Sequence, residues 1–190
     1  MAGERPPFVR AVRDAHPDKE VEVWFEDEAR IGQQGTLTTV WAERGSRPTA
    51  VKQTEYEWAY ISAAVNPITG RALGVITPDM DTSVMNDLLW NLSLELGEHR
   101  HAVLVWDGAG FHTSGLLEVP GNITLLRLPP YSPELNCVER IWLWMRGHDL
   151  SNRAYPEQPD VEHAIAESCS RLDAGRIRSI CHTEWLGRIE

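Results

Sequence analysis

Residues 128–142 read LPPYSPELNCVERIW, an apolar, strand-like end that passes through three prolines into a helix. Apolar side chains then repeat at the i, i+3, i+4, i+7 spacing of one helical face, at Val138, Ile141, Trp142 and Met145. Proline fixes the backbone angle φ, so the prolines limit the freedom of the chain just before this helix. We therefore expect Glu139, in the first turns of the helix, to be held firmly against the rest of the fold.

The segments upstream of this stretch are predicted to form strands. Apolar residues alternate over 21–27, which places Asp27 at the end of a strand. The β-branched or aromatic runs at 35–45, 56–67 and 71–78 are separated by turn residues, and they predict an antiparallel meander of about three strands.

A helix and two further strands follow. Apolar residues spaced four apart predict a helix over 82–99, capped by Thr82 or Ser83. The nearly continuous apolar run over 101–107 is typical of a strand buried on both faces, and 122–129 is a further short strand. This order predicts an α/β fold in which helices pack on a mixed sheet.

Three carboxylates lie at the boundaries of these elements. Asp27 ends the first strand, Asp107 ends the buried strand, and Glu139 begins the helix after the prolines. Carboxylates held close together repel and raise one another's pKa unless a cation lies among them. Mg²⁺ prefers such oxygen ligands, and two ions about 4 Å apart can support phosphodiester cleavage. The pattern is that of a metal site for phosphodiester chemistry.

Ordinary structural roles are the alternative for each of these carboxylates. Asp27 lies within an acidic run, which is typical of a solvated strand end, and Asp107 precedes a glycine, as turn residues commonly do. Glu139 follows Asn136 by three residues, the spacing of a capping box. Composition and spacing alone leave both interpretations open.

The composition limits the class of protein. The 190 residues suffice for one domain with a single core, and three widely spaced cysteines indicate neither a zinc site nor a disulfide framework. No apolar run is long enough to span a membrane and no signal peptide is evident, so we expect a cytoplasmic protein. The net charge of −10 argues against a chain that binds nucleic acid tightly by itself.

Three stretches resemble the motifs of one family, the insertion-sequence transposases of the mariner superfamily. LPPYSPELNCVERIW at 128–142 resembles the family signature LPxYSPxLNPIExxW, which is a specific match. VWDGAGFH at 105–112 resembles the family's strand that ends in Asp, and FEDEARIG at 25–32 resembles its first motif. The three motifs occur in the family's order and cover most of residues 20–150.

The resemblance implies a ribonuclease H-like fold and a catalytic DDE triad, placed here at Asp27, Asp107 and Glu139. These three residues would also be the ligands of Mg²⁺, with Mn²⁺ as a substitute. The implied reaction is cleavage of a DNA phosphodiester by water, followed by attack of the released 3′ hydroxyl on target DNA. The implied partners are the DNA of the transposon ends and of the target.

The chain departs from the family pattern at two places near the triad. Cys137 stands where the family usually has proline, which removes a rigid residue at the helix start but no ligand. The 31 residues between Asp107 and Glu139 are a few short of the usual spacing, and the surface connection at 116–122 is the expected place of the deletion. Both changes leave the three carboxylates intact.

The resemblance also suggests a domain organisation. We expect residues 1–20 to be the remnant of an upstream helix or linker, and residues 21–190 to be the catalytic domain. The family's helix-turn-helix domains, which bind the transposon ends, have no counterpart here and would belong to an upstream domain or a separate polypeptide. Whether the chain forms a homodimer is left open.

Two alternatives to a transposase remain at the level of sequence. One is another ribonuclease H-like nuclease that cuts DNA without strand transfer. The other is an inactive remnant that acts as an interaction module.

Several residues near the motifs have ambiguous roles. His112 is a candidate phosphate contact or a local cap, and Tyr131 and Ser132 are candidate DNA contacts. Arg30 and Arg140 are the basic residues nearest the triad in sequence, and Arg140 could equally pair with a glutamate.

Overall fold

The structure is a computed structural model that describes residues 7–33, 37–49, 53, 55–107, 115–130 and 132–182. Their strands form one sheet in the order β3-β2-β1-β4-β5. The strands are β1 (Glu20–Gly32), β2 (Trp58–Val65), β3 (Ala72–Thr77), β4 (Arg100–Trp106) and β5 (Ile123–Arg127). Because β1 pairs antiparallel with β2 and parallel with β4, the predicted mixed sheet is confirmed.

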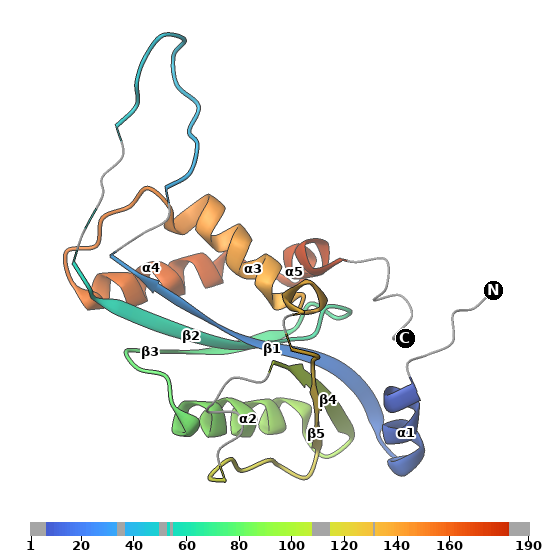
Figure 1. The fold of residues 1–190 in the computed structure, drawn as a ribbon. Helices are drawn as coiled ribbons and strands as arrows, with labels where there is room; N and C mark the ends of the chain where they lie inside the picture. The colour runs from blue at the N-terminus through green and yellow to red at the C-terminus, as the bar shows by residue number, and fades with distance from the viewer. Residues whose placement is uncertain are drawn as a thin grey trace.

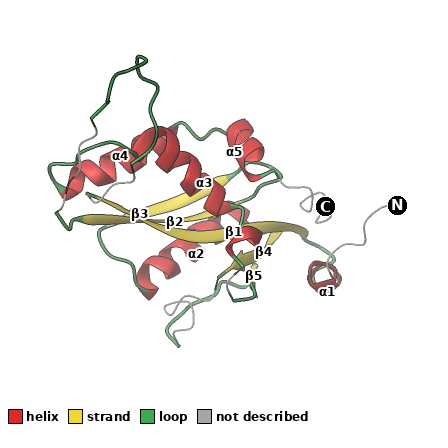
Figure 2. Ribbon diagram, turned by 45° about the horizontal axis from the view of Figure 1, so that its top comes forward, coloured by secondary structure: helices red, strands yellow, loops and turns green. Residues whose placement is uncertain are grey.

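Helices cover both faces of this sheet. They are α1 (Pro7–Ala15), α2 (Thr82–Leu96), α3 (Val138–Met145), α4 (Gln158–Ser170) and α5 (Ala174–Cys181), with short helical turns at η2 (Pro133–Leu135) and η3 (Arg146–Leu150). In Figure 1, α2 lies on one face of the sheet and α3, α4 and α5 lie on the other. Figure 2 shows the sheet between these two layers.

Strand β1 contributes to the two hydrophobic cores that these layers enclose. Alternate residues of a strand point to opposite faces. Val23 and Phe25 therefore join the core beneath α3, α4 and α5, and Trp24 joins the core beneath α2. The sheet is buried on both faces where β1 and β4 meet, as expected for parallel neighbours in an α/β fold.

The prediction that Asp27 ends its strand is wrong. Strand β1 continues to Gly32, because it changes partners: its first half pairs with β4, and its second half pairs with β2. Phe25 is the last residue paired with β4 and the first paired with β2. Asp27 therefore lies just past the end of the parallel pairing, inside a longer strand.

The strand predicted at 35–45 is also absent from the part that the structure describes. Residues 37–49 contain neither helix nor strand, and Figure 1 shows them in a long connection that projects from the sheet between β1 and β2. Leu37, Val40 and Trp41 are exposed there, Trp41 completely. β-branched residues form a strand only when a partner is available, and here the meander is made by β1, β2 and β3.

The other predicted elements are confirmed, with two corrections. The cap of α2 is Asp81 and not Thr82 or Ser83, since the Asp81 side chain accepts a hydrogen bond from the Val84 N–H. Helix α5 was not predicted, because only Ile177 and Cys181 bury on its inner face and this stripe is too short to reveal a period.

Helix α1 packs on the same domain as the strands. Its inner residues Val9 and Val12 are buried in the core that also contains Val21. The boundary drawn at residue 20 stays a prediction. Within the described residues, no helix has the length and apolar character that crossing a membrane requires.

Candidate active site

Asp27 is a buried carboxylate on β1, with 6% of its surface exposed. The Trp142 indole of α3 donates a hydrogen bond from Nε1 to Asp27 Oδ2 at 2.8 Å. Asp27 therefore points to the face of the sheet that α3 covers. The interpretation of its acidic run as solvated is wrong, because neighbouring Glu26 is also fully buried.

Asp107 is brought to the same end of the sheet by the parallel pairing of β1 and β4. It directly follows Trp106, the last residue of β4, and it is exposed. Phe25 is paired with Val105. Asp27 and Asp107 each lie two residues beyond this pair, so the strand register places them beside one another.

Glu139 enters the same region from α3. Its helix begins at Val138, after the proline-containing turn η2. The capping-box interpretation of Glu139 is wrong, because the Asn136 N–H donates to the Pro133 carbonyl at 2.9 Å and the helix N-cap is Cys137. Glu139 is half-buried, and its carboxylate is not required to cap the helix.

The three carboxylates line one pocket with a volume of about 390 Å³. The other lining residues come from the end of β5 and from the segment that leads into α3: Arg127, Leu128, Pro129, Pro130, Ser132, Pro133 and Asn136. Three elements distant in sequence therefore converge on one cavity, as the sequence predicted for the carboxylates.

The electrostatics of the pocket disfavour negative charge. Burial is the main cause that raises the pKa of Asp27 to about 8, and the negative charges of Glu139, Glu28 and Asp107 raise it further. The hydrogen bond from Trp142 partly opposes this rise in the pKa. A carboxylate in such a place gains from a cation, which would offset both desolvation and repulsion.

Two glutamates on the opposite face of β1 have raised pKa values as well. Burial, followed by the charge of Asp107, raises the pKa of Glu28 to about 7. Burial is also the largest cause that raises the pKa of Glu26 well above its usual range, although a hydrogen bond from Ser62 Oγ at 3.0 Å opposes the rise. Carboxyl groups with a raised pKa are therefore not confined to the three predicted residues.

The donor set fits a hard divalent cation. Carboxylate oxygens are the ligands that Mg²⁺ and Mn²⁺ accept, and the pocket brings them from β1, the end of β4 and α3. Among the residues that the structure describes, no three His, Cys, Asp or Glu side chains are gathered closely enough to form a ready metal cluster. The ligand role of Asp27, Asp107 and Glu139 stays a prediction.

The remaining predicted residues have varied positions. His112 and Tyr131 lie outside the described residues, whereas Ser132 lines the pocket. Arg30 lies over the Trp58 ring at 4.2 Å, and Arg140 donates to the carbonyl of His182 at 2.7 Å.

Sequence reasoning missed two contacts of the third motif and one residue of the pocket. The sequence predicts Trp142 only as a core residue and Asn136 only as a cap, yet Trp142 contacts Asp27 and Asn136 lines the pocket. No pattern in the sequence marks Arg127, although it lines the pocket. The one available sequence signal was spacing: Asn136 and Trp142 stand three residues before and three residues after Glu139, which could have indicated that they lie near it.

Comparison with solved structures places this architecture in a known fold. The chain matches the catalytic domain of Mos1 mariner transposase with a TM-score of 0.58 and 14% identity, over 95% of this chain and 82% of that one. It matches the Mos1 mariner paired end complex with Mn at a TM-score of 0.65 and 14% identity, over 95% and 58% of the two chains. The expected ribonuclease H-like fold is thereby confirmed.

Comparison with protein sequences gives relatives of two lengths. An uncharacterized protein, y4pE/y4sA, of Sinorhizobium fredii (strain NBRC 101917 / NGR234) is 43% identical over 133 residues, which are 69% of this chain and 98% of the relative. The insertion element IS630 uncharacterized 39 kDa protein of Shigella sonnei is 25% identical over 160 residues, 75% of this chain. The match covers only 46% of the Shigella protein.

The family is established by a direct match to its model. Residues 22–162 match the model of the DDE superfamily endonuclease, and this span includes all three carboxylates of the pocket. The match extends over most of the chain and agrees with the fold. The chain therefore belongs to the DDE superfamily of endonucleases.

Proposed function

We propose that this chain is the catalytic domain of an insertion-sequence transposase, with residues 21–190 forming the domain. It cuts a DNA phosphodiester with water and then joins the released 3′ hydroxyl to target DNA. The observation that carries the proposal is the convergence of Asp27, Asp107 and Glu139 on one pocket in a DDE-family fold.

In this proposal the three carboxylates hold one or two Mg²⁺ ions, with Mn²⁺ as a substitute. Asp27 and Asp107 present their oxygens from adjacent strands, and Glu139 presents its own from the facing helix. A bound divalent cation lowers the pKa of water and stabilises charge on the phosphate oxygens. Arg127 also lines the pocket, so a positive charge lies beside the three carboxylates.

The charge of the chain suggests how it would bind its DNA partners. With a net charge of −10, the isolated chain should bind DNA weakly and lose that binding steeply as salt is added. Recognition of the transposon ends would then reside in a helix-turn-helix domain or polypeptide upstream, and a homodimer would pair two ends. A cytoplasmic location accords with the absence of a membrane-spanning helix among the described residues.

The decisive experiment compares Glu139→Gln with the wild-type chain in Mn²⁺-dependent nicking of supercoiled DNA at low salt. The amide keeps the size of the side chain but removes the charge, so nicking should fall on the order of 1,000-fold, about 4 kcal/mol in barrier, while thermal unfolding barely changes. Glu134→Gln is the matched control, because Glu134 is exposed in the same motif and does not line the pocket.

Further outcomes separate the transposase from its alternatives. Joining of an oligonucleotide with a free 3′ hydroxyl to target DNA would support transposition, whereas nicking without joining would indicate a simple nuclease. An active Glu139→Gln chain would exclude Glu139 as a ligand. Failure of the wild-type chain to bind millimolar Mn²⁺ would indicate an inactive remnant.

A further inference from the structure

Asn136 and Trp142 lie on either side of Glu139, three residues before it and three residues after it. Both side chains reach β1, where they contact two consecutive residues. The Asn136 Nδ2 group donates to the carbonyl oxygen of Glu26 at 2.8 Å. The Trp142 Nε1 group donates to Asp27 Oδ2 at 2.8 Å. The segment that carries Glu139 is therefore bonded to β1 on both sides of that residue.

These two hydrogen bonds are shielded from water. Asn136 and Trp142 are each 3% exposed, so a lost bond would leave buried polar atoms unsatisfied. Asn136 is fixed from a second direction as well, because its Oδ1 accepts from the Val138 N–H at 3.1 Å. The start of α3 is thereby fixed relative to β1.

The chemistry of the indole donor distinguishes Trp142 from an ordinary core residue. Indole carries one neutral N–H and no acceptor, so it orients a carboxylate without neutralising the negative charge. Its bond engages Oδ2 of Asp27 and leaves Oδ1 for another partner. A phenylalanine would fill most of the same space in the core without providing this bond.

We propose that Trp142 and Asn136 are positioning residues for the metal ligands of this pocket. Trp142 fixes the Asp27 carboxylate through Oδ2 so that Oδ1 is available to a divalent cation, and Asn136 fixes the start of α3 so that Glu139 faces the same cation. This inference rests on the proposed function, because it assumes that Asp27 and Glu139 bind the metal. It assigns the two side chains a role in metal affinity beyond their role in packing.

The test is the Mn²⁺ affinity of Trp142→Phe, measured by titration calorimetry on the whole chain without DNA. The substitution removes the N–H and retains an aromatic ring. Groups that orient metal ligands typically change metal affinity by about 10- to 100-fold, so the dissociation constant should rise by that factor. Circular dichroism and thermal unfolding confirm that the variant is folded under the conditions of the titration.

Trp144→Phe is the matched control on the same helix. Trp144 is half-buried, stacks on His148 with ring centroids 4.8 Å apart and lies beneath Arg176. It lines no part of the acidic pocket. The same chemical change at this position should leave the Mn²⁺ dissociation constant within about twofold of wild type, well below the effect at Trp142.

The dependence of nicking on Mn²⁺ concentration provides a second readout. If Trp142 positions a ligand, Trp142→Phe should raise the half-saturating Mn²⁺ concentration and recover much of its rate when Mn²⁺ is in excess. A purely structural role would lower the rate by the same factor at every Mn²⁺ concentration, through loss of folded protein. Unchanged half-saturation, or an equal shift in Trp144→Phe, overturns the proposal.

If Trp142→Phe does not fold, Asn136→Ser is the second variant, and it tests whether the bond from Asn136 to β1 positions Glu139. Serine is too short to keep the bond to the Glu26 carbonyl, so weaker Mn²⁺ binding is expected. If neither variant folds, the two residues serve stability first and the proposal fails. Asp27→Asn separates this failure from failure of the proposed function, because wild-type Mn²⁺ affinity in Asp27→Asn would refute the metal site itself.

Discussion

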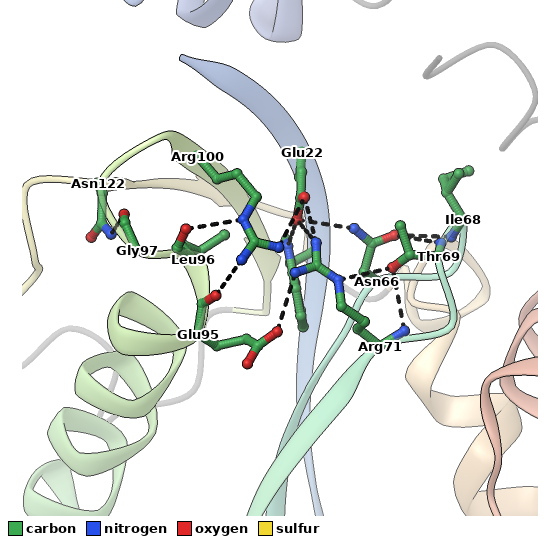
Figure 3. Close-up of polar contacts among 11 residues, drawn as sticks. Glu22, Asn66, Ile68, Thr69, Arg71, Glu95, Leu96, Gly97, Arg100 and Asn122 are labelled. Carbon is green, nitrogen blue, oxygen red and sulfur yellow. Dashed lines mark hydrogen bonds and ion pairs between the residues drawn. The ribbon is translucent and has the colours of Figure 1, made fainter.

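Two carboxylates of strand β1, those of Glu22 and Asp27, have opposite electrostatic surroundings. Near the start of β1, Glu22 accepts hydrogen bonds from Arg71, Trp24 and Asn66, and Arg100 Nη1 lies 3.8 Å from Glu22 Oε1. Figure 3 shows Arg71, Asn66 and Arg100 around Glu22. Five residues further on, Asp27 accepts a hydrogen bond from a neutral indole and lies near other carboxylates. One carboxylate is paired with cations and the other is surrounded by anions.

This difference indicates the role of each carboxylate. Arg71 binds Glu22 and also Glu95, at 3.2 Å, so its guanidinium ties the start of β1 to the β2–β3 turn and to α2. Glu22 is thereby a structural carboxylate whose charge is compensated within the fold. Among the described residues no ion pair to Asp27 is recorded, and its raised pKa shows that its charge is a cost to the folded state. We interpret this uncompensated charge as the feature that favours cation binding.

The largest effect is expected when the charge of Asp27 or of Glu22 is removed by an amide substitution and Mn²⁺-dependent nicking of the two variants is compared. Asp27→Asn should lower Mn²⁺-dependent nicking on the order of 1,000-fold, because it removes a ligand, yet it should raise the melting temperature of the metal-free protein near pH 8. Glu22→Gln should leave nicking per folded molecule unchanged. It should lower stability by about 2 kcal/mol, or about 4–8 °C in melting temperature, because Arg71 loses the less exposed of its two carboxylate partners.

Asp27→Asn should thus lose activity but not stability, and Glu22→Gln should lose stability but not activity. Nicking assays at equal concentrations of folded protein, together with scanning calorimetry, test this difference. The comparison fails if Glu22→Gln abolishes nicking in folded protein, or if Asp27→Asn destabilises the metal-free protein as much as Glu22→Gln does.

A second expected effect is an unusual dependence of stability on pH. The folded-state pKa of Asp27, about 8, and that of Glu28, about 7, exceed their ordinary values of 3.8 and 4.5. The folded protein thus holds protons that the unfolded chain releases. The corresponding stability is complete below about pH 4 and is lost progressively as the pH rises through 7 to 8.

Thermal unfolding of metal-free protein between pH 5 and 8.5 measures this loss. Asp27→Asn should flatten the curve, and millimolar Mn²⁺ should restore stability to the wild-type chain most strongly above pH 8. Identical curves for wild type and Asp27→Asn would show that Asp27 does not carry the effect.

A smaller effect is expected from Arg71→Met, which keeps the apolar stem and removes the charge. Glu22 would lose its main partner, and the contact of the guanidinium with the Trp24 ring at 5.2 Å would disappear. Stability should fall by about 2 kcal/mol, with the rate of nicking per folded molecule unchanged. Urea denaturation measures the loss, and a double-mutant cycle with Glu22→Gln should show strong coupling.

The smallest effect is expected from Arg100→Met. Its ion pair with Glu22 is long and its side chain is 30% exposed, so solvent screens most of that interaction. The change also removes bonds from Arg100 to the carbonyls of Leu96 and Glu95 at the end of α2. A loss of about 0.5–1 kcal/mol is expected by urea denaturation. A loss equal to that of Arg71→Met would contradict the assignment of Arg71 as the main partner of Glu22.

Much of the fold was predictable because its elements have strong local signals. The apolar periods of α2 and α3, the continuous apolar run of β4 and the turn between β2 and β3 all act within a few residues. The convergence of the three carboxylates on one pocket was predictable because each stands at a fixed place within a short motif, and their role as metal ligands stays a prediction.

Features that depend on distant partners were not predictable. The length of β1 is set by β2, which extends the strand past Asp27, and the β-branched run at 35–45 has no strand to pair with in its described part. The bond between Trp142 and Asp27 joins residues 115 positions apart, and the Arg71–Glu22 pair joins residues 49 apart. No local pattern reports such contacts.

The sequence by itself determined the order of the elements and the identity of the three carboxylates, because periodicity and motif spacing are local properties. Tertiary structure decided which carboxylate is compensated. Glu22 and Asp27 are both acidic residues of one strand, Glu22 between two valines and Asp27 between two glutamates, and neither setting names the partner of the carboxylate. Only the folded chain brings Arg71 to Glu22, and an indole and further carboxylates to Asp27, because these partners come from other elements of the sheet and its helices.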